Sequence, residues 1–253
     1  MNLPSPLAAI PASRSDRWSV LREVAAQWYP PLQPADGVPF GELEIAERRL
    51  GHSLPAALRE WYSLAGRRTD IWSRQDHVLS PVDFRINGDH LVFVVENQGV
   101  VEWGIRRDEM GGDDPPVYVS SVDDPNVWLK ENDSLSAFVL QWFAYCLKWS
   151  NQCRWWANAY VSQEVLTRLG DNYPRLPLIV RHWPGPTQFH GCRDLVAQFD
   201  PVVGMDHTWL YVVTRTASAA ELFKQVMGPL KIEWNASSED WPPGWLSASE
   251  DLE

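Results

Sequence analysis

The chain has few cysteines, no long apolar run and no leader that resembles a secretory signal. Its 253 residues include three cysteines, Cys146, Cys153 and Cys192, too few for a disulfide framework. No apolar run approaches the roughly twenty residues that a membrane helix needs. The first residues, MNLPSPLAAIPASR, lack a basic start, and prolines interrupt their short apolar run. We therefore expect a protein of the reducing cytoplasm.

The common catalytic motifs are also missing. There is no phosphate-binding glycine loop, no dinucleotide-binding fingerprint, no nucleophile elbow and no His-Glu-x-x-His zinc helix. We expect no catalytic residue, no cofactor and no metal, although many active sites leave no local motif.

Basic residues are outnumbered by acidic ones. The chain has 22 Lys and Arg against 33 Asp and Glu, which gives a net charge of −11. Such a balance argues against nucleic acid or an anionic membrane as the main partner. It suits a basic protein, because opposite potentials steer association. Solubility alone would explain the charge equally well.

Tryptophan is abundant, with 15 residues in the chain. Their periodic apolar neighbours place five of them in the core: Trp61, Trp103, Trp128, Trp142 and Trp149. Trp155-Trp156, Trp241 and Trp245 break the pattern and are expected to be exposed. Exposed tryptophans are typical of binding hot spots, and they also line sugar-binding clefts.

The stretch PFGELEIAERRLGHSLPAALREWYSLAGRR, residues 39–68, predicts two short helices. Leu43, Ala46 and Leu50 recur at helical spacing, and Gly51 supplies the left-handed residue that ends a helix. Leu54-Pro55 restarts the chain, since proline is tolerated in a first turn. The second helix turns Leu58, Trp61 and Leu64 inward and ends at Gly66.

This pair of helices resembles the signature of the SUKH superfamily. The resemblance rests on Ile45-Ala46-Glu47-Arg48-Arg49-Leu50-Gly51, on Leu54-Pro55 and on Leu58-Arg59-Glu60-Trp61-Tyr62. It is clear over about thirty residues, with weaker support for about another eighty. The chain departs from the family at Ala65-Gly66-Arg67-Arg68, where members often carry a glycine pair.

After the helices the pattern changes to that of an antiparallel sheet. Strands are predicted at 82–86, 91–95 and 100–105, joined by turns at 87–89 and 96–99. Asp113-Asp114-Pro115 with Val117 and Asp123-Asp124-Pro125 with Val127 are two similar turns, each leading into a strand. Ser134 is the predicted N-cap of a long helix with Leu135, Phe138, Trp142, Tyr145 and Trp149 on one face, similar to the helix that closes the SUKH domain.

The remainder predicts a smaller region. Helices are expected at 162–169, closed by Gly170, and from Ser218 to Met227, and strands at 178–180, 195–199, 209–213 and 230–234. The fold class is therefore α+β: N-terminal helices on a mainly antiparallel meandering sheet, closed by a long aromatic helix, plus a smaller C-terminal α+β region. The predicted parts are 1–33, a leader (disordered over 1–15) with a short helix; 34–150, the SUKH-like domain; 151–234, the C-terminal region; and 235–253, a disordered acidic tail.

Two groups of residues are candidate sites. The acidic loops contain Asp108, Glu109, Asp113, Asp114, Asp123 and Asp124, which suit the rim that meets a basic partner, plain turns or, without EF-hand spacing, calcium. His182, His190, Cys192 and His207 are the best metal candidates, but their spacing matches no common zinc pattern. Cys192 and His190 could also form a thiol–imidazole pair.

The resemblance implies a non-catalytic binding protein, specifically an immunity protein that neutralises a cognate basic toxin of the nuclease type. An acidic surface would compete for the basic groove that a nuclease uses for phosphates. One alternative, from the yeast cell-wall glucan-synthesis regulators of the same superfamily, is a scaffold for endogenous partners. Another is a metal-dependent enzyme that uses the His182–His207 region.

Overall fold

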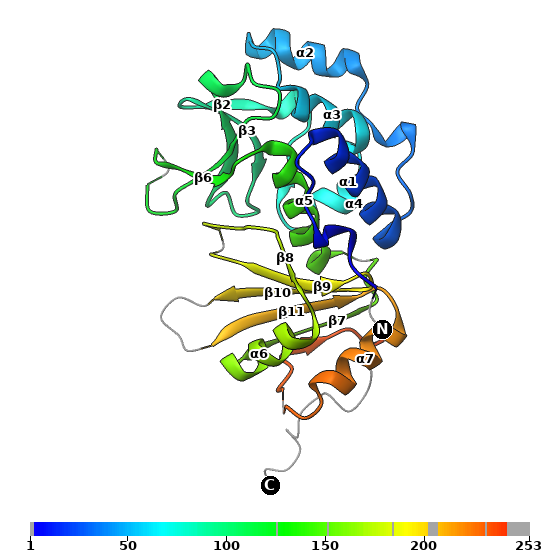
Figure 1. Ribbon diagram of the computed structural model, residues 1–253. Coiled ribbons are helices and arrows are strands. Elements are labelled where there is room, and N and C mark those ends of the chain that lie inside the picture. The colour runs from blue at the N-terminus through cyan, green and yellow to red at the C-terminus, as the bar shows by residue number, and fades with distance from the viewer. Residues whose placement is uncertain are drawn as a thin grey trace. The chain divides into compact units, whose positions relative to one another are not determined.

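The computed structural model describes residues 3–124, 126–150, 152–183, 185–201, 207–230 and 232–241, and it contains two compact units (Figure 1). The first unit comprises Ile10–Ser150 and Ile179–Trp183. The second comprises Met1–Ala9, Asn151–Leu178 and Pro184–Glu253. Each unit has its own antiparallel sheet with helices, which confirms the predicted α+β class. No helix in the described part of the chain is long and apolar enough to cross a membrane.

The first unit begins with helix α1, Arg14–Trp28. The Ser13 hydroxyl accepts a hydrogen bond from the Asp16 backbone N–H at 3.1 Å and so caps the helix. Leu21, Val24 and Ala25 are fully buried, and α1 packs against helix α5, Leu135–Cys146. The disorder predicted over 1–15 is wrong for much of this stretch, because residues 6–8 form a 3-10 helix with Leu7 buried, the Pro11 carbonyl accepts from Arg17, and α1 begins at Arg14.

The predicted helix pair is confirmed as α2, Phe40–Leu50, and α3, Ala56–Ala65. Gly51 adopts the left-handed conformation at φ 71°, and Pro55 stands at the N-cap of α3. The Glu47 carboxylate joins the two helices, because it accepts hydrogen bonds from the Leu54 backbone N–H at 2.7 Å and from the Arg59 guanidinium. A short helix that the sequence did not predict, α4, Thr69–Trp72, follows.

The sheet of the first unit is antiparallel throughout, in the order β1-β3-β4-β5-β6, with β2 paired to β3. Its strands are β1 His77–Val78, β2 Arg85–Asn87, β3 His90–Val95, β4 Glu102–Arg106, β5 Val117–Ser120 and β6 Trp128–Asn132. The predicted strand at 82–86 is wrong in its first half, because Pro81–Asp83 forms a 3-10 helix, η3. A second 3-10 helix, η4, covers Arg107–Glu109.

Helix α5 is the centre of the first unit, since α1, α3, α4 and β6 all contact it. Nearly all of its residues are buried, and Trp61, Trp103 and Trp142 lie in the core as predicted. Trp149 is 37% exposed, contrary to the prediction. The reason is that the α-helix ends at Cys146 and continues as a 3-10 turn, η5, Leu147–Trp149, which shifts the helical periodicity.

The second unit contains a sheet in the order β12-β7-β11-β10-β9-β8, also antiparallel. Its elements are β7 Trp155–Val161, α6 Gln163–Asn172, β8 Arg175–Leu176, β9 Gln188–Cys192, β10 Leu195–Pro201, β11 Thr208–Thr214, α7 Ala217–Met227 and β12 Ala236–Ser237. Its core joins Ala157, Leu210 and Val212 of the sheet to Leu169 of α6 and Phe223 of α7.

Several predictions for the second unit are wrong. Residues 178–180 and the described residues of 230–234 are not strands, and α6 continues past Gly170. Helix α7 is capped by the Thr216 hydroxyl, which accepts from the Ala219 N–H at 3.2 Å, and Ser218 lies inside the helix. Strands β7 and β9 were not predicted. Trp155 and Trp156 are half-buried because both lie on β7.

Both chain ends contribute to the second unit. A 3-10 helix, η1, Pro6–Ala8, lies beside β8 and buries Leu7 completely. At the other end, β12 pairs with β7, and Trp241 is only 5% exposed against the prediction. The predicted disordered tail is thus ordered over 235–241. The rest of that prediction, with Trp245, lies outside the described residues.

Candidate interaction surface

The six predicted carboxylates lie in two loops of the first unit. Residues 107–116 connect β4 to β5 and begin with η4, and residues 121–127 connect β5 to β6. Each loop contains the pattern Asp-Asp-Pro-x-Val. The surroundings of the two loops differ, and this difference decides which carboxylates are available to a partner.

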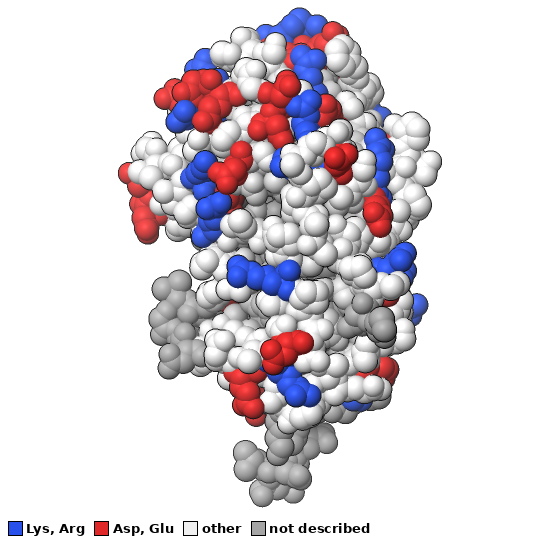
Figure 2. Space-filling model, in the orientation of Figure 1, with Lys and Arg blue, Asp and Glu red and all other residues white. Residues whose placement is uncertain are grey.

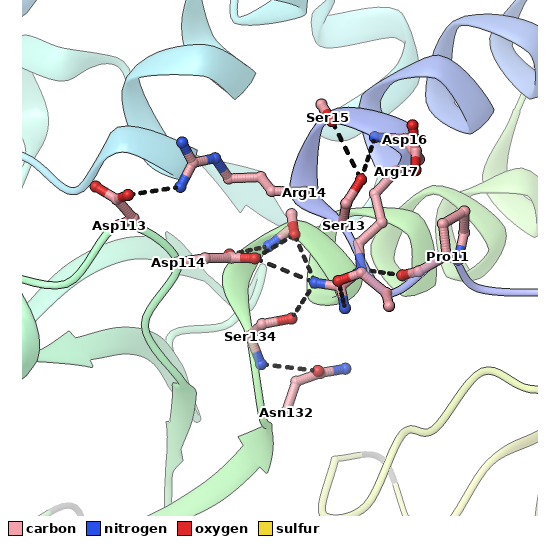
Figure 3. A network of polar contacts seen from close by, with 12 residues as sticks. Pro11, Ser13, Arg14, Ser15, Asp16, Arg17, Asp113, Asp114, Asn132 and Ser134 are labelled. Carbon is pink, nitrogen blue, oxygen red and sulfur yellow. Dashed lines mark hydrogen bonds and ion pairs between the residues drawn. The ribbon is translucent and has the colours of Figure 1, made fainter.

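Asp114 is a structural residue of the first loop (Figure 3). Its Oδ1 accepts a hydrogen bond from the Ser136 backbone N–H at 2.8 Å, and its Oδ2 accepts from the Ser136 hydroxyl at 2.5 Å. Asp114 thereby satisfies an N–H of the first turn of α5. Ser134 is the N-cap by position, as predicted, but its side chain makes no capping bond. It accepts instead from Arg17 Nη1 at 2.8 Å.

Arg17 of α1 completes this network. Its Nη1 lies 3.1 Å from Asp114 Oδ2, and its Nε donates to the Pro11 carbonyl at 2.7 Å (Figure 3). The side chains of Arg17 and Asp114 are only 15% and 17% exposed. Charge-assisted hydrogen bonds of this kind are stronger than neutral ones, and removing one partner leaves the other charge uncompensated. The contacts of Asp114 therefore join α1 to α5 and leave little of its side chain exposed.

The remaining carboxylates of the first loop have basic or phenolic partners. Asp113 is 82% exposed and lies 3.5 Å from Arg14. Asp108 accepts from Arg106 Nε at 2.6 Å, and Glu109 accepts from Arg106 Nη2 at 3.3 Å and from the Tyr118 hydroxyl at 3.1 Å. Burial and the bond to Glu109 raise the pKa of Tyr118. These pairs partly neutralise the loop.

The β5–β6 loop has a different character. Asp123 and Asp124 are exposed, and no basic side chain pairs with either of them among the described residues. Asp124 Oδ1 accepts from the backbone N–H and the side-chain amide of Asn126, both at 3.0 Å, so this carboxylate shapes a turn and stays accessible. On the face drawn in Figure 2, acidic groups stand where this loop projects, while elsewhere acidic and basic groups are interspersed.

Exposed apolar side chains lie in the same loop and at the start of β6. Val122 is 50% exposed, Val127 45% and Leu129 38%. Because β6 is the last strand in the sheet order, these residues lie at an edge of the sheet. We call Val122, Asp123, Asp124, Val127 and Leu129 the hairpin-tip surface. Sequence reasoning selected its two aspartates and missed its apolar residues, although valines on both sides of a polar turn were a readable signal.

The metal and thiol candidates do not form a site. Among the residues that the structure describes, no group of three His, Cys, Asp or Glu side chains is placed to hold a metal. His182 belongs to the first unit, whereas His190, Cys192 and His207 belong to the second. His190 Nδ1 is hydrogen-bonded to the Tyr173 carbonyl and not to Cys192. The three cysteines are buried, and burial raises the pKa of Cys146 and Cys192.

Comparisons with protein-family models, with curated proteins and with solved structures found no match for this chain. In the hairpin-tip surface, two carboxylates without a basic partner among the described residues adjoin two exposed valines and an exposed leucine.

Proposed function

We propose that this chain is a non-catalytic binding protein that neutralises a basic, nuclease-type protein toxin by direct contact in the cytoplasm. The hairpin-tip surface carries the proposal. Protein interfaces combine a desolvated apolar centre with charged groups that steer the partner and set specificity. Asp123 and Asp124 supply negative charge that no basic side chain in the described part of the chain pairs with, and Val122, Val127 and Leu129 supply apolar area. The SUKH-like pattern of residues 39–68 gives independent support.

The test begins with capture of the tagged protein from its own cells at low and then high salt. The expected result is one basic protein that salt releases and that is toxic when expressed alone. A set of housekeeping proteins, or no partner, would favour the scaffold alternative.

Charge reversal at the surface then tests the docking site. With the captured partner, the double variant Asp123→Lys/Asp124→Lys should associate about tenfold more slowly at low salt, because it replaces attraction by repulsion at the contact. The matched control is Glu23→Lys/Asp89→Lys, which makes the same change of net charge at exposed positions of the first unit. Equal association rates for the two double variants would remove the hairpin-tip surface from the interface.

A further inference from the structure

A cavity of about 330 Å³ opens within the second unit, between α6 and the edge formed by β9, β10 and β11. This volume lies in the range of small-molecule sites. The helix contributes Gln163, Gly170 and Asp171 to the wall, and the strands contribute Gln188, His190 and Phe199. Strand register explains the grouping, because Phe199 pairs with Gln188 and Ala197 pairs with His190, so that Gln188, His190 and Phe199 face α6 together.

The hydrogen bonding of His190 fixes its chemical role. Nδ1 lies 2.9 Å from the Tyr173 carbonyl oxygen, which can only accept, so Nδ1 carries the proton. Nε2 therefore presents a lone pair, and no described residue donates to it. Burial lowers the pKa of His190, which keeps the imidazole neutral at physiological pH. The ring contacts Phe199 edge-on, with centroids 5.3 Å apart, and this contact holds its orientation.

The charges around the cavity narrow the class of ligand. None of the described residues that line it is lysine or arginine, and the carboxylate of Asp171 in the wall would repel a phosphate or carboxylate. A cation would meet Asp171 but also the positive charge of Arg175, which acts on His190. The imidazole Nε2 and the Asp171 carboxylate accept hydrogen bonds, while the two glutamine amides both donate and accept. A neutral ligand with several hydroxyl groups matches this set.

We propose that the cavity binds a neutral polyhydroxylated ring, such as a pyranose sugar. The ring hydroxyls donate to His190 Nε2 and Asp171 and exchange hydrogen bonds with the amides of Gln163 and Gln188. The apolar C–H groups of the sugar contact the small part of Phe199 that reaches the cavity wall. This site lies wholly in the second unit and does not depend on the toxin-binding proposal.

Saturation-transfer NMR with the full chain tests the proposal. The probes are the methyl glycosides of glucose, galactose and N-acetylglucosamine at millimolar concentration, and glucose 6-phosphate is the anionic comparison. We expect transfer from the protein to at least one neutral glycoside, and at least tenfold weaker binding of the phosphate. No transfer to any of the three neutral glycosides, or equal binding of the phosphate, would overturn the proposal.

Two substitutions test the site in different ways, one by removing a hydrogen-bond acceptor and one by filling the cavity. His190→Asn keeps a side-chain N–H in reach of the Tyr173 carbonyl and removes the acceptor at Nε2. Gly170→Leu fills the cavity from a helical position, where a side chain is well tolerated and a Cβ would lie 3.6 Å from His190 Cε1. Each should weaken glycoside binding at least tenfold, whereas Glu164→Gln, on α6 outside the cavity, should not change it. Unchanged binding in both folded variants would show that the sugar binds elsewhere.

Discussion

The two Asp-Asp-Pro-x-Val loops have almost the same local sequence and very different contacts. In the first, Asp114 is held by Arg17 and Ser136 and fixes the start of α5. In the second, Asp123 and Asp124 face solvent beside exposed valines. The local sequence does not cause the difference. It arises because Arg14 and Arg17 of α1 contact the first loop and not the second. An acidic motif therefore indicates a binding surface only where no cation of the same fold already occupies it.

The largest expected effect comes from removing the ion pair between Arg17 and Asp114 in the first loop. Asp114→Ala removes the partner of the mostly buried Arg17 and leaves the Ser136 N–H without its acceptor. We expect the free energy of unfolding to fall by about 3 kcal/mol, measured by urea denaturation.

The matched change in the other loop is Asp124→Asn, which keeps the oxygen that accepts from Asn126. It should shift the free energy of unfolding by less than about 0.5 kcal/mol, as is usual for exposed positions. Equal losses from the two substitutions would mean that the two loops are energetically equivalent despite their contacts.

A third carboxylate extends the comparison. Backbone N–H groups hold it, whereas Arg17 holds Asp114. Glu131 of β6 is fully buried, and its oxygens accept from the backbone N–H groups of Arg181 at 2.8 Å and His182 at 3.1 Å. Burial, the leading cause, raises the pKa of Glu131 despite these bonds. The carboxylate thereby attaches the segment Ile179–Trp183 to the first unit, although the residues on both sides of this segment belong to the second.

Glu131→Gln should lower the free energy of unfolding by about 2 kcal/mol. A glutamine places an NH₂ group against one of the two backbone donors, and a hydrogen bond to a charged acceptor is lost. Hydrogen exchange should show faster exchange of the Arg181 and His182 amides. Glu23→Gln, at an exposed position of α1, is the control and should leave these amides unchanged. Unaltered exchange in Glu131→Gln would mean that other contacts hold the segment.

Elements whose signals lie close together in the sequence could be predicted, whereas contacts between residues far apart in the sequence could not. Helices α2 and α3 were predicted because their start and stop signals, Gly51 and Pro55, act locally. The tie between Arg17 and Asp114 joins residues 97 positions apart, so no local pattern contains it. Strand β7 was missed for a related reason. Tryptophans at 155 and 156 suggested exposure, but pairing with β11 and β12 makes this segment an interior strand of the sheet.

Among the carboxylates that the fold encloses, the smallest effect is expected at Asp76. Unlike Asp114, this buried carboxylate has incomplete hydrogen bonding. Asp76 is 3% exposed; its Oδ1 accepts from the Asn97 N–H at 3.2 Å, and its Oδ2 has no hydrogen-bond partner. Burial is the leading cause that raises the pKa of Asp76 from 3.8 to about 6, and the nearby charge of Glu96 adds to it. Because this pKa is raised on folding, its stabilising contribution is complete below pH 3.8 and is lost as the pH rises through 6.

Asp76→Asn has no ionisable group at this position. Its free energy of unfolding should therefore not fall as the pH rises through 6. At pH 4 the variant should be no more stable than the wild type, since an amide N–H₂ then replaces a neutral carboxyl without a partner. At pH 8 it should be more stable by about 1–2 kcal/mol, which is less than the full cost of the pKa shift because the unpaired amide offsets part of it. Urea denaturation of both proteins across this pH range measures the difference directly. A difference that stays constant with pH would mean that Asp76 ionises in the fold as easily as in the unfolded chain, and that its burial carries no penalty.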